Sequence, residues 1–332
     1  MFWELKGQQN VFKTIAIGLR KFLFWSATSI ILLLFVLIIL LQTPVFQNYL
    51  GDRAIDFINS NTRQTAKFTN IEIKWFDFVE IKGLEIKDYA GKVLLSADAI
   101  KVDYELSRLL YNNQIAFDDV SLSGAKLNFN KYADSLDINL IELIKDLNSF
   151  KPKPADSLAK PKPMQLIVHE IHLDEFQFSY NNELKDSLSA ERFDYGHFLL
   201  DVPVGSFEDF YLVNDTIEAR IISLAAIDKA SRLSIDALKA YFRLSNVGLE
   251  LNELELLTPN SHVRDMVHFR YNGLDDLGYF VDSVEMDINL VNSRIGKKDL
   301  DYFAEIPGDP FTVFAETTIK GKVPGLSLQE AT

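Results

Sequence analysis

The sequence predicts a mainly β protein that begins with one transmembrane helix and continues as bulged strand repeats joined by short helices. Two observations predict this class. A strand pattern recurs along the chain, and an uncharged run of twenty residues lies near the N-terminus. A chain that grows by repeating one β unit builds a long continuous surface rather than a compact pocket.

The clearest repeat relates residues 114–130, QIAFDDVSLSGAKLNFN, to residues 165–181, QLIVHEIHLDEFQFSYN, fifty-one positions later. Few identities survive, but seven apolar positions correspond one to one. They are Ile115, Phe117, Val120, Leu122, Ala125, Leu127 and Phe129 in the first block and Leu166, Val168, Ile171, Leu173, Phe176, Phe178 and Tyr180 in the second. We therefore expect the two blocks to form equivalent strands.

The shared frame is apolar-x-apolar-x-x-apolar-x-apolar, and it returns in residues 79–86 and 249–256. Alternation with period two indicates a strand. The additional residue in the middle changes the phase, as a β-bulge does. A helix would need apolar residues at i+3 and i+4, but Lys82 and Gly83 occupy these positions after Val79. The frame therefore predicts bulged strands.

Residues 22–41 carry no charge. At about 1.5 Å per residue, a helix of this length spans about 30 Å, which is the thickness of a bilayer core. A signal peptide has a shorter apolar region, of about 7–15 residues, and ends in a small-residue cleavage site. The exit at residues 42–44, Gln-Thr-Pro, has no such site, so the run favours a retained anchor.

Basic residues flank this run on one side. Four precede it, and in the twenty residues that follow only Arg53 is basic. The positive-inside rule therefore predicts a cytoplasmic N-terminus at residues 1–21, a single-pass anchor at residues 22–41 and an exported remainder. The four flanking residues are Lys6, Lys13, Arg20 and Lys21.

The exported part is acidic. Beyond residue 21, 30 basic and 46 acidic residues remain, which gives a net charge of −16. Phosphate contacts need clustered Lys and Arg, so we expect no nucleic-acid partner. An apolar fraction of 48% with 25 Phe residues excludes a disordered chain. The lack of cysteine excludes disulfides and Cys-ligated metals.

Local patterns divide the exported part. Residues 45–60 fit an amphipathic helix, and residues 137–148 fit a second helix with Asp137 as its N-cap. The sequence KPKPADSLAKPKP at residues 151–163 predicts an extended, polyproline-like tether. The predicted organisation is a first β segment with helices at residues 45–150, a Pro/Lys linker at residues 151–164 and a second β segment at residues 165–332.

Several shorter segments complete this prediction. Alternation predicts strands at residues 71–75 and 100–106, and Ser123-Gly124 is typical of a turn. Residues 231–242 fit both a strand and a helix, and we favour a strand because the next segment carries the strand frame. Residues 298–303 predict one or two helical turns. Alternation begins again at Leu326, so we expect the sheet to continue beyond residue 332.

No catalytic site is predicted. The chain holds no Gly-rich phosphate loop, no G-x-S-x-G and no H-E-x-x-H. His169 and His172 would point to opposite faces of a strand, and the adjacent Asp118 and Asp119 fit a bulge or turn better than a carboxylate pair. We therefore expect no enzyme activity, no cofactor and no metal.

The alternating apolar faces leave two interpretations open. Either two sheets bury these faces against each other in a solid core, or one curved sheet surrounds an apolar lumen that holds lipid chains. The periodicity of the sequence is the same in both cases.

Residues 46–106 combine an end-of-anchor helix, FQNYLGDRAIDFINSN, with an I-x-I…I-K-G-L-x-I-x-D strand pair and an L-x-A-x-x-I-x-V strand. Further motifs are LELLTPNS at residues 254–261 and KDLDYFAEI at residues 298–306. In these motifs and in their order, the chain resembles the N-terminal part of TamB-like proteins of the AsmA superfamily of Gram-negative bacteria.

The resemblance implies a β-taco, which is an elongated, twisted, open-sided sheet around an apolar groove. It also implies an inner-membrane anchor, a periplasmic C-terminal region, and phospholipid transport toward the outer membrane in support of outer-membrane biogenesis. The implied partners are phospholipid, the inner membrane and an outer-membrane β-barrel assembly protein. The expected groove-lining residues are Ile71, Ile73, Val79, Ile81, Ile115, Phe117, Val120, Leu122, Leu166, Val168, Ile171 and Leu173.

Three functions stay open at this point. The first is the lipid-conducting groove. The second is an assembly scaffold or chaperone that guides outer-membrane proteins by strand addition at its edge and conducts no lipid. The third is an exported structural domain with a solid core.

Overall fold

A computed structural model gives the structure of this chain, which is mainly β with one large mixed sheet and an apolar N-terminal helix. It describes residues 2–75, 77–104, 115–135, 137–149, 165–188, 191–213, 216–273, 276, 279–303, 305–322 and 327–329. The linker predicted at residues 151–164 lies outside these ranges. The chain divides into two compact units, Met1–Asp52 and Arg53–Thr332.

The first unit consists of α1 (Phe2–Leu41) and the beginning of α2 (Pro44–Asn61). Within α1, Phe24–Leu41 is long and apolar enough to cross a membrane. A membrane anchor and a signal sequence both meet this criterion. The helix predicted at residues 45–60 is confirmed as α2.

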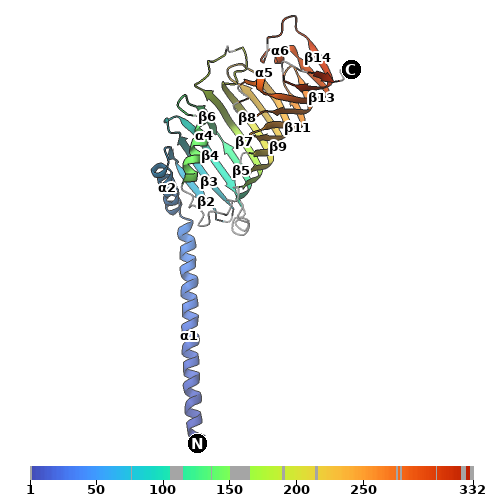
Figure 1. Ribbon diagram of the computed structural model, residues 1–332. Coiled ribbons are helices and arrows are strands. Elements are labelled where there is room, and N and C mark those ends of the chain that lie inside the picture. Colours follow the sequence, from blue (N-terminus) through green and yellow to red (C-terminus); the bar gives the residue numbers. More distant parts are fainter. Residues whose placement is uncertain are drawn as a thin grey trace. The chain divides into compact units, whose positions relative to one another are not determined.

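The second unit is built on one 15-stranded sheet (Figure 1). Apart from β2 and β6, which pair beside this path, the order of strands in the sheet follows the order in the chain. The strands are β1 Thr65–Lys67, β2 Asn70–Ile73, β3 Phe78–Lys87, β4 Val93–Asp103, β5 Ile115–Ser123, β6 Lys126–Lys131, β7 Gln165–Asn182, β8 His197–Val213, β9 Thr216–Asp228, β10 Ser234–Ser245, β11 Gly248–Leu257, β12 His262–Arg270, β13 Glu285–Gly296, β14 Thr312–Gly321 and β15 Ser327–Gln329.

The two blocks of the sequence repeat lie side by side. β5 and β6 both pair with β7 in parallel, and the other strand pairs are antiparallel. The register between the blocks has the same offset of fifty-one as the repeat, with Ile115 opposite Leu166 and Phe129 opposite Tyr180. Parallel neighbours need a crossover, and α4 (Asn139–Ser149) lies in it between β6 and β7.

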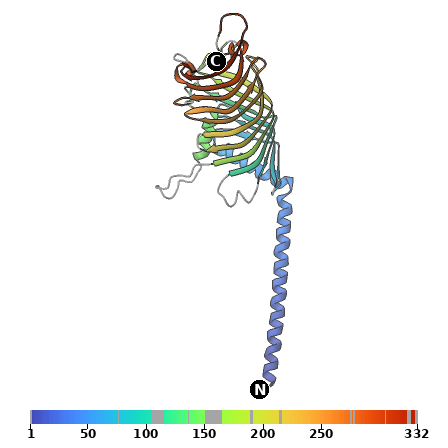
Figure 2. The same ribbon diagram turned by 90° about the vertical axis from the view of Figure 1, so that its right-hand side faces the viewer.

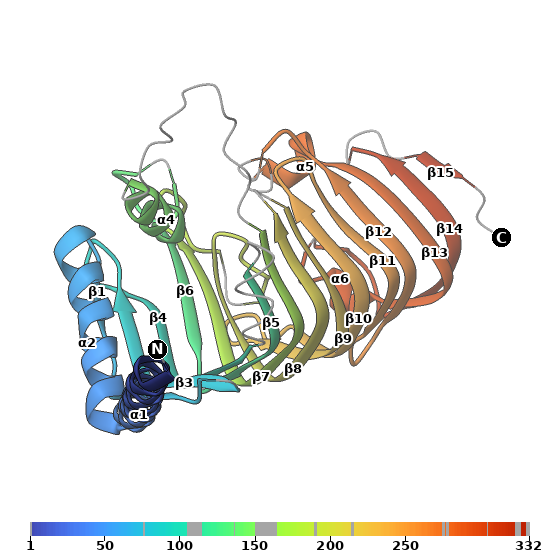
Figure 3. The same ribbon diagram turned by 90° about the horizontal axis from the view of Figure 1, so that it is seen from below.

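Several strands contain a residue with a left-handed backbone, that is, with positive φ, at a recurring position in the apolar pattern. In all but one case the residue is the second of two that separate a pair of apolar positions, as Gly83 is between Ile81 and Leu84; the exception is Asn292, which the polar Ser293 follows. A left-handed residue at the first position of a bulge bends its strand, and the strands of this sheet are visibly curved (Figures 2 and 3). The residues are Gly83, Gly124, Glu175, Asp209, Glu253, Asp265 and Asn292.

One predicted bulge is confirmed by a shift of register. Glu253 has φ 51°, and the register against β12 shifts between Leu251 and Leu254. Gly83 has φ 61° at the predicted place in β3, but the register against β4 is the same on both sides of it. At Asp118 and Asp119 the register between β5 and β7 does not shift, because the two strands pass this position together, with Asp118 and His169 left out of the ladder. The same block also has a left-handed residue at Gly124, which the sequence predicts in a turn.

The predicted short elements are confirmed with one correction. The segment at 231–242 is a strand from residue 234 onward, in β10, and residues 298–303 overlap α6 (Lys297–Leu300) and the turn after it. The predicted helix at 137–148 is α4, but Asp137 is not its N-cap. The helix begins at Asn139, the amides of Ile141 and Glu142 bond to the carbonyl of Ile138, and Asp137 pairs with Lys145. The remaining helix, α5, is Phe280–Ser283.

Candidate functional site

Two rows of apolar residues cross the sheet on one face. Each row follows residues that are Cα partners in successive strands, and such opposed residues share a face. The first row is Ile71, Ile81, Ile100, Leu122, Leu173, Gly205 and Leu224, and the second is Ile73, Val79, Val102, Val120, Ile171, Phe207 and Ile221. Eight of the twelve residues expected to line a groove therefore lie in two continuous rows.

The other four expected residues lie beside these rows. Phe117 is opposite Val168, which is opposite Phe210 of β8. The bulge at Asp209 places Phe207 and Phe210 on one face, because the register between β8 and β9 shifts there by one residue. Val168 is consequently on the face of Ile171 and is buried. The other pair is Ile115 and Leu166, which are opposed in the same ladder.

The apolar face is packed side to side but only half-buried. Leu173, Val202 and Ala226 form one buried cluster, and Ile221, Ala240 and Leu254 form another. Phe207 and Leu224 pack against both clusters and join them, and both remain partly exposed. A Cβ at Gly205 would lie 3.2 Å from a methyl group of Leu173 and 3.2 Å from one of Leu224. The side chains of these two leucines therefore occupy the space next to the glycine.

The sequence analysis missed the part of this face between β8 and β12. Leu224, Leu238, Phe242 and Val267 belong to it together with Phe207, but they were not assigned to a site. The apolar frame at residues 249–256 could have predicted this part of the face, because Leu251, Leu254 and Leu256 pack into the same cluster.

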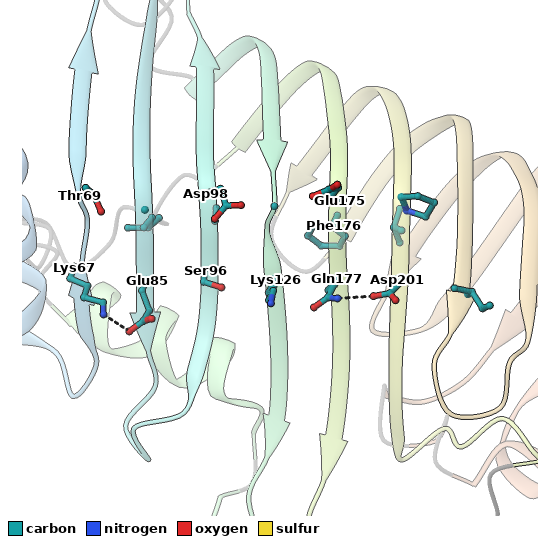
Figure 4. A pocket seen from close by; sticks show the side chains of 17 residues that line it. Lys67, Thr69, Glu85, Ser96, Asp98, Lys126, Glu175, Phe176, Gln177 and Asp201 are labelled. Atoms are coloured by element: carbon teal, nitrogen blue, oxygen red, sulfur yellow. Dashed lines mark hydrogen bonds and ion pairs between the residues drawn. The ribbon is translucent and has the colours of Figure 1, made fainter.

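A trough of about 840 Å³ crosses the strands beside this face, and it is lined by polar side chains together with apolar ones such as Phe176 and Val202 (Figure 4). One row of its side chains contains ion pairs and hydrogen bonds. Lys67 and Glu85 are 3.1 Å apart, and the Gln177 amide donates to Asp201 at 2.8 Å. These polar residues alternate with apolar ones such as Phe176, so the sheet has one polar and one apolar face.

The titratable groups singled out in the sequence lie on the polar side of β5, β7 and β8. The His172 Nε2 lies 3.1 Å from an Asp119 carboxylate oxygen and 3.3 Å from one of Glu170. His169 lies 4.0 Å from Asp209 instead. The side chains of His172, Glu170 and His169 are exposed to water, as expected for ion-paired side chains on the polar face of a sheet.

The predicted membrane flank lies within α1. Lys6, Lys13, Arg20 and Lys21 all precede Phe24–Leu41 on this one helix. Arg20 and Lys21 are exposed. A comparison with models of protein families and with curated proteins found no match for this chain.

Proposed function

We propose that this protein is a membrane-anchored, exported conduit whose apolar sheet face lines an open groove for phospholipid tails. One observation carries the proposal: within the described residues the apolar face belongs to a single sheet, and no second sheet covers it. Large half-buried apolar surfaces on soluble domains mark binding grooves. An apolar chain of a lipid is a suitable occupant, since the face is continuous across strands rather than closed into a pocket.

The chemistry of transfer needs no catalytic residue. Each CH₂ group that stays on an apolar face instead of entering water saves about 0.8 kcal/mol. The headgroup would remain at the open side, in contact with water. The likeness to TamB-like proteins supports the same function and the periplasmic location, with the anchor in the inner membrane.

The experiment places a charge in the path of the tails. Phe207 joins the two apolar clusters, and its neighbour Ser206 points to the other face of β8. We expect Phe207→Asp to stay folded, because a carboxylate in an open groove can reach water, and to copurify with several-fold less phospholipid. Phe207→Asn controls for the lost ring, and Ser206→Asp controls for the added charge.

The outcomes separate the open interpretations. Thermal unfolding and copurified phospholipid are measured for all three variants. If Phe207→Asp fails to fold while Phe207→Asn folds, the face is a packed core, because burying a charge there is severely destabilising. If Phe207→Asp is folded and keeps its phospholipid, the groove proposal is wrong at this position.

A second candidate function, an assembly scaffold, is favoured by the edge of β14. Among the described residues, β15 covers only Thr318, Ile319 and Lys320 of that strand, and Phe314 is 80% exposed. An uncovered strand edge can take up a strand of another protein. Crosslinks from Phe314 to an unfolded outer-membrane protein, without copurified phospholipid, would support this function instead.

A further inference from the structure

Three segments that are distant in the sequence meet in one aromatic cluster. The loop at residues 191–196, between β7 and β8, contributes Phe193 and Tyr195. Phe280 comes from α5, which precedes β13, and Phe303 comes from the turn after α6, which follows β13. We call these four residues the aromatic clasp.

The contacts of the clasp are mutual. The Tyr195 ring stacks on Phe280 at 6.5 Å between centroids and 9° between planes, and it lies 6.3 Å from Phe303. Phe193 is 5.2 Å from Tyr195 and 6.2 Å from Phe303. Ring pairs at these separations attract each other in addition to burying apolar area.

Polar bonds hold the same loop to the α6 side. The Phe193 amide donates to the Tyr302 carbonyl at 2.9 Å. Beside it, Arg192 and Glu305 form an ion pair at 3.1 Å. The loop is therefore attached to the turn after β13 by a backbone hydrogen bond, an ion pair and two ring contacts.

The clasp joins the two flanks of one bent strand. β13 has 12 residues, and a straight strand of this length would hold its ends about 36 Å apart. Phe280 and Phe303 lie beyond opposite ends of β13, yet both contact Tyr195. The loop thus bridges across the curvature of β13, which Figure 3 shows as an arc. Phe269 of β12 packs on Phe280 at 5.0 Å and connects the clasp to the apolar face.

The clasp is suited to open without unfolding the sheet. Tyr195 is 45% exposed and Phe303 is 50% exposed, so water already reaches their rings. The backbone of the loop is fixed separately. The buried Asp194, between Phe193 and Tyr195, accepts hydrogen bonds from the amides of Leu188, Gly196 and His197. The Tyr195 ring can turn away from its partners while these bonds keep the backbone of the loop in place.

We propose that the aromatic clasp is a gate that closes the open side of the groove at the level of β12 and β13. This inference rests on the proposed function for its cargo, an acyl chain held beneath the closed clasp. A chain can leave sideways only when Tyr195 separates from Phe280 and Phe303. Above and below the clasp, the groove exchanges its contents freely.

The test uses the absence of cysteine in this chain. A single reporter, Val267→Cys, lies two residues from Phe269 on the same face of β12. Its labelling by a bulky maleimide is followed in the full-length protein in nanodiscs. We expect Tyr195→Ala to speed labelling about tenfold, since losing about 1.4 kcal/mol of contact energy is a factor of ten. Tyr195→Phe, which keeps the ring, should label at the original rate.

Two controls make the outcome decisive. Tyr241→Ala removes a ring whose neighbours Ala240 and Phe242 face the apolar cluster, so Tyr241 itself lies on the opposite face. A second reporter, Ile171→Cys, lies on β7, outside the clasp. The gate is wrong if Tyr195→Ala and Tyr241→Ala label Val267→Cys equally fast. It is also wrong if Tyr195→Ala speeds both reporters alike, since the loop would then stabilise the whole sheet.

Uptake of a fluorescent phospholipid from phosphatidylcholine vesicles separates the gate from the proposed function. If no variant takes up lipid, the proposed function fails, whatever the labelling rates show. If lipid is taken up but the labelling of Val267→Cys does not respond to Tyr195→Ala, the gate alone fails. Faster labelling together with faster lipid exchange in Tyr195→Ala supports both.

Discussion

Single residues in left-handed conformations shape this sheet. Glycine adopts positive φ at no steric cost, whereas other residues are strained by about 1–2 kcal/mol there. Gly83 and Gly124 also lie directly under a neighbour. A Cβ on Gly83 would meet the Thr69 Oγ1 at 2.3 Å, and one on Gly124 would meet an Asp98 oxygen at 2.2 Å. These two glycines are therefore required both by their conformation and by the side chains that cover them.

Gly83→Ala should lower the free energy of unfolding by more than the cost of its φ alone. Gly91→Ala is the matched control, because Gly91 has φ 78° but no atom within 4 Å of an added Cβ. We expect about 1–2 kcal/mol for Gly91→Ala and a clearly larger loss for Gly83→Ala in urea unfolding. Thr69→Ala in the Gly83→Ala background should recover the difference. Equal losses in the two single variants would show that the contact with Thr69 is unimportant.

At the scale of elements, the sequence predicted the strands well because burial on one face imposes period two on them. It predicted the bulged positions only in part. Gly83 marks its left-handed position with a glycine, but Glu175 and Glu253 adopt the same left-handed conformation without a residue type that favours it. The contact between residues 191–196 and both flanks of β13 was not predictable either, since it depends on how far the bulges curve the strands.

A buried polar network fixes the start of α4. The Asn139 side chain donates to the Asp88 carboxylate at 2.9 Å and accepts from the Asn130 amide at 3.0 Å, and Tyr132 donates to Asp88 at 2.5 Å. Asn139 and Asp88 are almost fully buried. Burial and the Asp88 carboxylate together raise the pKa of Tyr132, which keeps this hydroxyl a proton donor.

Asn139→Ala should therefore destabilise the protein by about 2–3 kcal/mol, because it leaves the buried Asp88 carboxylate and Asn130 amide short of partners. The exposed Asn272→Ala is the control and should change the free energy of unfolding by less than about 0.5 kcal/mol. Urea unfolding followed by circular dichroism gives both values. A loss at Asn139 as small as that at Asn272 would mean that α4 is held by its apolar contacts alone.

The loop that carries the clasp makes stability depend on pH through Asp194. Burial raises the pKa of this carboxyl, but the amides of Leu188 and Gly196 and the His197 imidazole outweigh it, and the net pKa is lowered. A lowered folded-state pKa stabilises the fold above the unfolded value of about 3.9, and this contribution is lost as pH falls through the folded pKa. Asp194→Asn should destabilise at pH 7, and the difference from the original protein should shrink below about pH 4. A difference that is constant from pH 7 to pH 3 in urea unfolding would contradict this role.

At the scale of the whole molecule, charge and hydropathy predict which side of the membrane each part occupies. Four basic residues precede residues 22–41, whereas only Arg53 is basic in the twenty residues that follow, and this asymmetry favours a cytoplasmic N-terminus. A reporter enzyme that is active only in the cytoplasm, fused after Pro44, should be inactive, and one that is active only after export should work. Activity of the cytoplasmic reporter at this junction would reverse the orientation.

The division into two units leads to a further expectation about the whole chain. Residues 53–332 form a compact unit of their own, so we expect the sheet to fold without α1. With α1 replaced by a cleavable signal peptide, the exported unit should be soluble and should keep the urea midpoint of the full-length protein. Under the proposed function it should also still copurify with phospholipid, because the apolar clusters lie entirely within this unit.

The proposed function makes a second prediction for the released unit. In cells that lack the full-length protein, this unit should not restore outer-membrane integrity, since a conduit without its anchor would not receive lipid from the inner membrane. Restoring the anchor with an unrelated transmembrane helix is the control and should restore integrity. Full rescue by the soluble unit would instead point to a scaffold or carrier that acts free in the periplasm.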